Sequence, residues 1–315
     1  MIAVVGPTAS GKSEWAMALA RSLGGELVNA DAFQLYRGMD IGTAKPSLAE
    51  RSEVPHHCID LLDIAQPATV AWFQRVARTA AVDIAARGRI PIIVGGSPLY
   101  VRAVCDHLDI PPSDPAVRRR LQDRADAEGA AAMHRELADR DPDAAAAIDP
   151  RNIRRVIRAL EVVELTGSFT ARLPQPRPWR PTWWVAPQWE RAELDVRIAE
   201  RTRRMWRAGL RDEVLELSRR GLVDAPTASR AVGYPQALAE LRGECGEDEA
   251  ISATVAATRR LARRQERTFR ADPRVRWFPG AGGAPVGAAR EFLSTDPAVV
   301  LRAEDGPEQR PGQPQ

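Results

Sequence analysis

Short apolar runs alternate with amphipathic stretches over the first hundred residues. Residues 2–5, 26–31 and 89–97 are largely apolar, as buried strands of a parallel sheet are. Between them, residues 13–23 and 70–87 repeat apolar side chains three and four apart, which predicts two amphipathic helices ended by Gly24 and Gly88. This alternation predicts an α/β fold with a parallel sheet flanked by helices.

The pattern changes after residue 112. From residue 114 to about residue 172 the apolar spacing is helical throughout, and prolines at 174, 176, 178 and 181 then predict a stiff linker. Residues 182–187 predict a further core strand, residues 191–220 and 247–270 two long helices, and residues 274–278 a last strand. We therefore expect a core in two parts (1–112 and 176–280), an all-helical insertion (113–175), and a disordered tail (281–315).

A glycine-rich loop joins the first strand to the first helix. It reads GPTASGKS and fits the phosphate-binding pattern G-x-x-x-x-G-K-[ST] at every position. In such a P-loop, backbone N–H groups and the helix N-terminus surround phosphate oxygens. We expect Lys12 to contact the terminal phosphates and the Ser13 hydroxyl to bind Mg²⁺. The predicted phosphate-binding residues are Gly6, Pro7, Thr8, Ala9, Ser10, Gly11, Lys12 and Ser13.

The acid that a P-loop kinase or ATPase needs is not at its usual place. Such enzymes hold Mg²⁺ with an acid after an apolar strand, but the strand at residues 89–97 ends in Gly95, Gly96 and Ser97. Asp31 follows a strand that we expect to neighbour the first and therefore to face the same crevice. From the residues alone, Asp31 is a metal ligand, a base or a turn former.

Charge and composition narrow the class of protein. Lys12 and Lys45 are the two lysines among 45 basic residues, so both are candidates for a compact point charge; Lys45 is either a substrate-side loop residue or an exposed spectator. Basic residues outnumber acidic ones sixteen to nine over residues 151–220 and eight to two over residues 259–276, which suits nucleic acid, with solvated helices as the alternative. Three scattered cysteines and short apolar runs favour a cytoplasmic protein without a membrane segment.

Seven segments, in order along the chain, resemble the bacterial tRNA dimethylallyltransferases: GPTASGKS, NADAFQLYRGMDIGTAKP, PHHCIDLLD, GRIPIIVGGSPLYV, RALEVVELTG, VGYPQ and RRLARRQ. The resemblance covers residues 2–276. It implies transfer of a dimethylallyl group from dimethylallyl diphosphate to N6 of adenosine 37, beside the anticodon, in tRNAs that read codons beginning with U. It also implies Mg²⁺ as cofactor, the tRNA anticodon stem-loop as partner, and a cytoplasmic monomer without an obligate protein partner.

The resemblance gives the P-loop a leaving group to hold. Charge grows on the diphosphate as the allylic C–O bond breaks, and the loop, Lys12 and Mg²⁺ stabilise it. The amine needs a proton acceptor, which the resemblance assigns to Asp31, and it assigns Gln34 to an adenine edge. Ser97 matches a hydroxyl that bonds the amine or the diphosphate; a helix N-cap is the alternative.

Further contacts implied by the resemblance lie on arginine-rich helices. The predicted tRNA-binding residues are Asp31, Ala32, Phe33, Gln34, Ser97, Arg118, Arg154, Arg155, Arg158, Arg263, Arg264 and Arg270. Arg154, Arg155 and Arg158 share one helix face, for which a solvated surface is the alternative. Arg230 is assigned to the diphosphate, and Gly233 and Tyr234 match a further family motif as secondary contacts. Arg197 and Arg201 are secondary candidates from their spacing alone, because residues four apart on a helix can converge on one anion of the diphosphate or the RNA.

Three positions depart from the family pattern, and two other classes of protein remain open from the residues. Ala32 stands in place of Ser, Pro98 of Gly and Thr268 of Trp. A P-loop kinase of a small metabolite would use the loop but leaves the basic regions unexplained. A nucleotide-gated RNA-binding protein without catalysis would use the charge but gives Asp31 and Ser97 no role.

Overall fold

Six parallel strands form one sheet. The computed structural model describes residues 1–171 and 174–295. The strand order is β3-β2-β4-β1-β5-β6, and every neighbouring pair is parallel. The strands are β1 (Ile2–Val5), β2 (Gly25–Asn29), β3 (His56–His57), β4 (Ile90–Gly95), β5 (Trp183–Gln188) and β6 (Val275–Pro279). The predicted α/β fold is thus confirmed, and β3 is an edge strand that the sequence pattern did not indicate.

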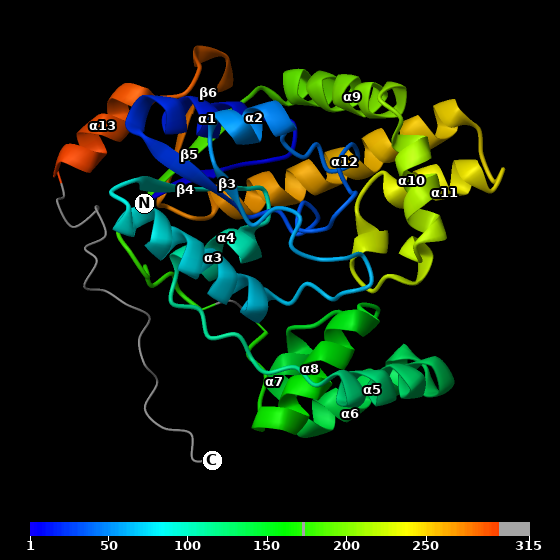
Figure 1. Cartoon of the computed structure of the whole chain (residues 1–315). Coiled ribbons are helices and arrows are strands. Elements are labelled where there is room, and N and C mark those ends of the chain that lie inside the picture. The colour runs from blue at the N-terminus through cyan, green and yellow to red at the C-terminus, as the bar shows by residue number, and fades with distance from the viewer. Residues whose placement is uncertain (172–173, 296–315) are drawn as a thin grey trace. The chain divides into compact units, whose positions relative to one another are not determined.

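Side-chain alternation along the strands builds two apolar layers. On β1, Ile2 and Val4 pack towards α1 (Lys12–Leu23), while Ala3 and Val5 pack on the opposite face. Helix α13 (Val286–Thr295) lies beside α1, and α3 (Val70–Ala86) and α4 (Pro98–Cys105) cover the other face (Figure 1). Both faces are covered, which explains why the central strands are apolar throughout.

The second part of the core is mostly helical. Its helices are α9 (Arg191–Arg207), α10 (Leu210–Arg219), α11 (Tyr234–Leu241) and α12 (Glu247–Arg270), with 3₁₀ turns η1 (Leu222–Asp224), η2 (Ala228–Arg230) and η3 (Gly280–Gly282); the short α2 (Leu48–Glu53) belongs to the first part. The prediction of one helix over residues 191–220 is wrong. Gly209 has φ +99°, which a right-handed helix cannot contain, so the chain turns there between α9 and α10.

The chain between the two parts of the core forms a compact unit of its own, Leu108–Arg177. It contains α5 (Pro115–Glu128), α6 (Ala130–Arg140), α7 (Pro142–Ala146) and α8 (Ile153–Thr166). Asp114, Asp141 and Asn152 cap α5, α7 and α8 through their side chains. The unit has its own apolar core, in which Met133, Leu137 and Leu160 are fully buried.

The prediction of a disordered tail is wrong for its first part. Residues 286–295 form α13, which packs on α1. Ala289 of this helix is fully buried in the apolar layer between α1 and the sheet, and Phe292 stacks on Trp183 of β5 with ring centroids 6.3 Å apart. Apolar side chains at helical spacing supply the burial that holds this segment against the sheet. Residues 296–315 lie outside the described part of the chain.

The described helices include none that is both long enough and apolar enough to cross a lipid bilayer.

Candidate active site

A cavity of about 770 Å³ opens where β1, β2 and β4 end, within the larger unit. Its walls include predicted site residues that follow β1 and β2, as parallel α/β sheets place ligands at the carboxyl ends of their strands. These are Thr8, Ala9, Gly11, Lys12, Ser13, Asp31 and Gln34. The volume lies within the usual range of small-ligand pockets.

Three side chains from the second part of the core hydrogen-bond to the backbone of the P-loop. The Trp189 indole N–H donates to the Ser10 carbonyl at 2.8 Å, and Arg197 Nε donates to the Ala9 carbonyl at 2.9 Å. Gln265 Oε1 accepts from the Thr8 N–H at 2.9 Å. The sequence analysis gave no role to Trp189 or Gln265. The one indication for Gln265 was its place as the uncharged polar residue of the RRLARRQ segment.

Positive charge gathers where the loop meets α9. Lys12, Arg197 and Arg201 line the cavity together, so the two arginines four residues apart converge as their spacing allows. Burial and the charge of Arg201 together lower the pKa of Lys12 to about 8, with burial the larger cause, although the Asp31 carboxylate partly offsets both. Burial likewise lowers the pKa of Arg201. Burial makes these cations costly to keep charged, and an anion bound beside them would offset that cost.

Asp31 lies in the same cavity as Lys12 and is held by its neighbours. Its Oδ1 accepts from the Phe33 N–H at 2.9 Å. The buried Asn29 side chain accepts from the Asp31 N–H at 3.2 Å and donates to the Cys58 carbonyl at 2.9 Å. The strand before Asp31 is not the direct neighbour of β1, because β4 lies between them; the crevice nevertheless spans all three strand ends.

The last residue of β4, Gly95, has no room for a side chain. A Cβ added at Gly95 would lie 2.5 Å from the Ala30 carbonyl oxygen, because β2 and β4 approach closely there. Ser97 precedes α4 at the N-cap position, but its hydroxyl makes no capping hydrogen bond in that helix. Ser97 is partly buried and is not among the residues that line the described cavity.

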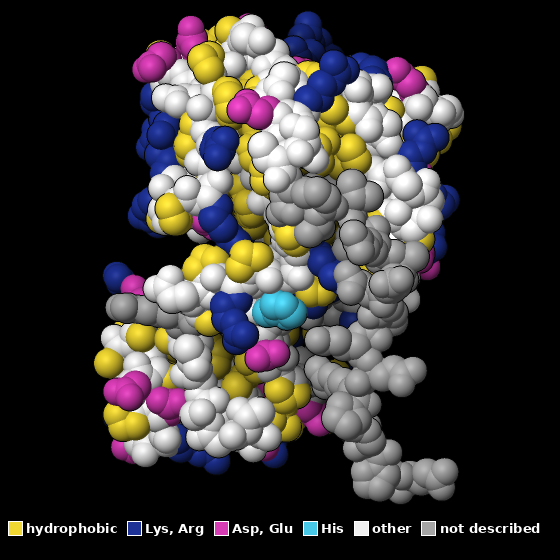
Figure 2. Space-filling model, turned by 90° about the vertical axis from the view of Figure 1, so that its left-hand side faces the viewer, with side chains coloured by type: hydrophobic (Ala, Val, Ile, Leu, Met, Phe, Trp, Pro, Cys, Tyr) yellow, Lys and Arg dark blue, Asp and Glu magenta, His cyan; other side chains and the backbone are white. Residues whose placement is uncertain are grey.

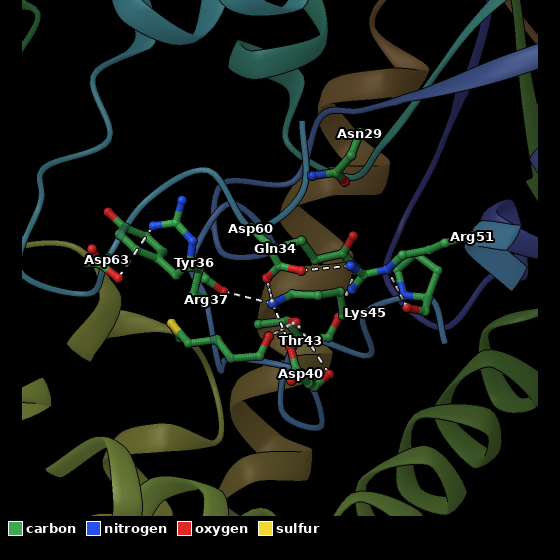
Figure 3. A network of polar contacts seen from close by, with 12 residues as sticks. Asn29, Gln34, Tyr36, Arg37, Asp40, Thr43, Lys45, Arg51, Asp60 and Asp63 are labelled. Carbon is green, nitrogen blue, oxygen red and sulfur yellow. Dashed lines mark hydrogen bonds and ion pairs between the residues drawn. The ribbon is translucent and has the colours of Figure 1, made fainter. Parts of the chain in front are cut away.

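Residues 34–46 form an irregular loop along the cavity, held by a polar network (Figure 3). Lys45 Nζ donates at 2.6 Å to both Asp40 and Asp60 and at 2.7 Å to the Tyr36 carbonyl, and its side chain is 1% exposed. Arg51 donates to the other oxygen of Asp60 at 2.6 Å. Lys45 is therefore no exposed spectator: it holds the loop.

Gln34 lines the cavity with a fixed amide. Its Nε2 donates to the Thr43 carbonyl at 3.1 Å and to the Ala44 carbonyl at 3.2 Å. Two carbonyl acceptors identify this atom as the NH₂ group and occupy both of its hydrogens. Oε1 therefore remains to face a ligand, and it can only accept a hydrogen bond.

Other predicted contacts of the larger unit lie away from the cavity walls. Arg230 is exposed in η2, and Arg263, Arg264 and Arg270 are exposed on α12. Arg270 pairs with Glu266 at 3.2 Å and lies over the Trp277 ring. Thr268 is exposed, and its hydroxyl donates back to the Arg264 carbonyl at 2.9 Å, so this position offers no stacking surface.

In the helical unit, two predicted tRNA-binding arginines surround a buried carboxylate. Arg118 and Arg158 donate to Glu161 at 2.5 and 2.8 Å, and the Glu161 side chain is fully buried. Arg158 also donates to the carbonyls of Pro111 and Pro112. Arg155 donates to the Ala171 carbonyl, and Arg154 is exposed. Arg118 and Arg158 thus hold this unit together, whatever else they bind.

The cavity has oxygen donors suited to Mg²⁺, although the described residues contain no cluster of three or more metal-binding side chains. The Ser13 hydroxyl and the Asp31 carboxylate both line the cavity. Mg²⁺ commonly takes one or two protein oxygens and completes its shell with phosphate oxygens and water. These residues therefore fit Mg²⁺ that arrives with a diphosphate.

Basic side chains recur on the surface. Figure 2 shows basic side chains at several places on this face of the molecule, some of them near acidic ones. Exposed arginines of α9 and α12 include Arg203, Arg204, Arg207, Arg260, Arg263, Arg264 and Arg267. These exposed arginines can pair with the phosphates of a polyanion that extends beyond the cavity.

Comparison with known proteins finds similar sequences over most of this chain. A family model described as IPP transferase matches residues 34–272, and one described as isopentenyl transferase matches residues 1–65. The tRNA dimethylallyltransferase of Salinispora arenicola is 53% identical over 92% of this chain and 85% of its own length. That of Streptomyces coelicolor is 54% identical over 89% of this chain and 90% of its own.

Solved structures are similar over nearly the whole chain. The full-length tRNA isopentenylpyrophosphate transferase of Bacillus halodurans is 38% identical, with a TM-score of 0.67 over 96% of this chain and 97% of its own. A eukaryotic dimethylallyltransferase acting on tRNA shares the fold, with a TM-score of 0.76 at 23% identity.

Proposed function

The chain belongs to the tRNA dimethylallyltransferase family and prenylates adenosine 37 of tRNA, and we propose that the cavity at the strand ends carries out this transfer. The donor is dimethylallyl diphosphate, the acceptor is N6 of the adenosine, and diphosphate leaves. One observation supports this proposal best: Lys12 of the phosphate loop and the candidate base Asp31 line the same cavity. A side chain at Gly95 would collide with the Ala30 carbonyl, so this position of β4 cannot carry the acid of an ATP-hydrolysing site.

The loop and its cations stabilise the leaving group. The allylic C–O bond breaks, and its electron pair stays with the diphosphate. Lys12, Arg197 and Arg201 place positive charge beside it, and the side chains that hold the loop carbonyls of Ala9 and Ser10 keep the loop preorganised. Mg²⁺, when bound with the diphosphate near Ser13, supplies further positive charge.

Asp31 receives the proton. The exocyclic amine forms the new C–N bond and gives one hydrogen as a proton to the Asp31 carboxylate. The Phe33 N–H bond to Oδ1 orients the carboxylate. Gln34 Oε1 accepts the amine's other N–H, which holds the nucleophile in place. Ser97 follows the adjacent strand β4, and we assign its hydroxyl to the substrate.

The tRNA binds beyond the cavity. Adenosine 37 belongs to the anticodon loop, so the base leaves its stack to reach Asp31. The predicted contacts Ala32, Phe33, Arg154, Arg155, Arg263 and Arg264 remain our assignment for the surrounding nucleotides. Arg230, exposed in η2, is left to RNA rather than to the diphosphate. We expect a cytoplasmic monomer.

A two-label incubation tests the proposal. Purified protein, Mg²⁺ and unmodified tRNA are incubated with labelled dimethylallyl diphosphate or with γ-labelled ATP. We expect label in RNA from the prenyl donor, with ATP unchanged. Phosphate released or transferred from ATP, with unlabelled RNA, would instead support the kinase alternative.

A further inference from the structure

Glu213 on α10 binds three successive backbone N–H groups of the cavity loop. Those of Asp40 and Ile41 donate to its Oε2 at 2.8 and 2.6 Å, and that of Gly42 donates to its Oε1 at 3.1 Å. A carboxylate that accepts several N–H groups at once fixes their direction more strongly than neutral acceptors do. Residues 40–42 are thus anchored to a helix that follows them by more than 170 positions.

Tyr234, at the start of α11, completes this anchor. Its hydroxyl donates to Glu213 Oε1 at 2.6 Å, and its side chain is fully buried. The ring packs directly on the loop, because a Cβ at Gly42 would lie 2.5 Å from Tyr234 Cε2. Burial, together with the Glu213 charge, raises the pKa of Tyr234, so the hydroxyl stays protonated and donates. Tyr234 therefore serves the loop and not a ligand phosphate.

The anchored residues continue into the turn that orients Gln34. The Ala44 N–H donates to the Ile41 carbonyl at 3.0 Å, which closes a turn directly after the anchored backbone. The carbonyls of Thr43 and Ala44 from this turn take both N–H groups of Gln34. Ala44 has φ +49°, a strained conformation for a non-glycine residue, so the turn needs support from outside.

We infer that Glu213 and Tyr234 are positioning residues for adenosine recognition: through the loop at residues 40–44 they hold Gln34 so that its oxygen faces the N6 amine. The inference rests on the proposed function of the cavity. It narrows the expected contact of Gln34 with an adenine edge to one accepting bond to N6–H, because its NH₂ group is already occupied. None of these contacts involves the P-loop, where dimethylallyl diphosphate binds.

Steady-state kinetics with each substrate varied separately test the inference. We expect Glu213→Gln to lower kcat/KM for the tRNA anticodon stem-loop about tenfold, because the amide presents an NH₂ group to backbone N–H donors. The KM for dimethylallyl diphosphate should stay within twofold of the wild-type value. Glu216→Gln, on the same helix but exposed and paired with Arg219, is the matched control and should change neither constant.

A double-mutant cycle separates positioning from general weakening. If Glu213 acts through Gln34, then Glu213→Gln has little further effect in a Gln34→Ala background. Additive losses, an equal loss for both substrates, or unchanged tRNA kinetics would each overturn the inference. Should Glu213→Gln not fold, Tyr234→Phe keeps the ring on Gly42 and is expected to cost about threefold in kcat/KM for tRNA alone. An inactive wild-type enzyme would refute the proposed function before any variant is compared.

Discussion

At the scale of single residues, the site depends on two groups whose charges compensate each other. Lys12 and Asp31 line one cavity, and the Asp31 carboxylate raises the pKa of Lys12 against the stronger, opposite effect of burial. Chemistry and binding can therefore be tested separately at these two residues.

Replacing Asp31 by Asn should remove the proton acceptor with little change of shape. We expect kcat to fall by about 10² to 10⁴, while tRNA affinity stays within a few-fold. Single-turnover prenyl transfer and filter binding of the same tRNA measure the two effects. Turnover close to that of the wild type would show that Asp31 is not the base.

The lowered pKa of Lys12 predicts a pH dependence. Above about pH 8 the free enzyme loses this charge, so kcat/KM for dimethylallyl diphosphate should fall. The folded group releases its proton below the usual 10.5, so between these pH values the unfolded chain binds more protons and this lysine adds stability as pH rises. The loss of activity is thus not unfolding.

A pH–rate profile of Lys12→Arg is the control for the predicted fall of kcat/KM above about pH 8. The guanidinium stays charged throughout the range, so the decline near pH 8 should disappear, although overall activity falls because the shape differs. A decline that persists in Lys12→Arg would assign the titration to another group.

At the scale of elements, the loop at residues 34–46 gets its shape from ion pairs and long-range hydrogen bonds. It has neither the periodicity of a helix nor an apolar strand pattern. Lys45 holds it to Asp60 and to the Tyr36 carbonyl, and Glu213 holds it to α10. A loop that carries Gln34 can therefore be ordered without secondary structure of its own.

Removing Lys45 should loosen this loop. We expect Lys45→Met to lower the free energy of unfolding by about 2 kcal/mol, less than the roughly 3–5 kcal/mol of a fully buried pair, because Asp60 keeps Arg51 and Asp40 is exposed. Urea denaturation measures the change. Arg219→Met breaks an exposed pair with Glu216 and should cost less than about 0.5 kcal/mol. Equal stability of the two variants would contradict the role given to Lys45.

At the scale of the whole molecule, a net charge of +3 conceals strongly basic regions. Within the described residues the α12 arginines at 263 and 264 are exposed, whereas Arg118 and Arg158 are committed to Glu161. Exposed arginines can neutralise tRNA phosphates without loss of an internal contact. This separates arginines that bind from arginines that hold the fold.

The salt dependence of tRNA binding tests this distinction. Arg263→Ala combined with Arg264→Ala should weaken binding and reduce the slope of log K against log salt by about one unit per lost phosphate contact. The free energy of unfolding should stay unchanged. Arg118→Ala, in contrast, should destabilise the protein, because it leaves buried Glu161 with one ion-pair partner fewer. An unaltered slope in the α12 variant would leave those arginines as a solvated surface.

The sequence by itself determined what depends on neighbours along the chain. The P-loop, the strands at residues 2–5 and 90–95, the α12 bounds and the position of Asp31 after a strand all follow from local pattern, because periodicity and turn residues act over a few positions. Family resemblance added the reaction. Errors arose where local signals compete: Gly209 interrupts an otherwise continuous helical pattern, and α13 lies in a Gly- and Pro-containing segment.

Only the tertiary structure decided which side chains meet. Gln265 reaches the Thr8 N–H across 257 positions, Arg197 reaches Ala9 across 188, and Glu213 reaches Ile41 across 172. No periodicity encodes such pairs, since they depend on how strands order in the sheet and how helices pack on it. The same packing leaves no space at Gly95 for an acid and buries Lys45 between carboxylates. A sequence pattern can thus identify the P-loop and the candidate base Asp31. The conformation of the cavity loops depends on contacts between residues far apart in the sequence, which form only in the folded chain.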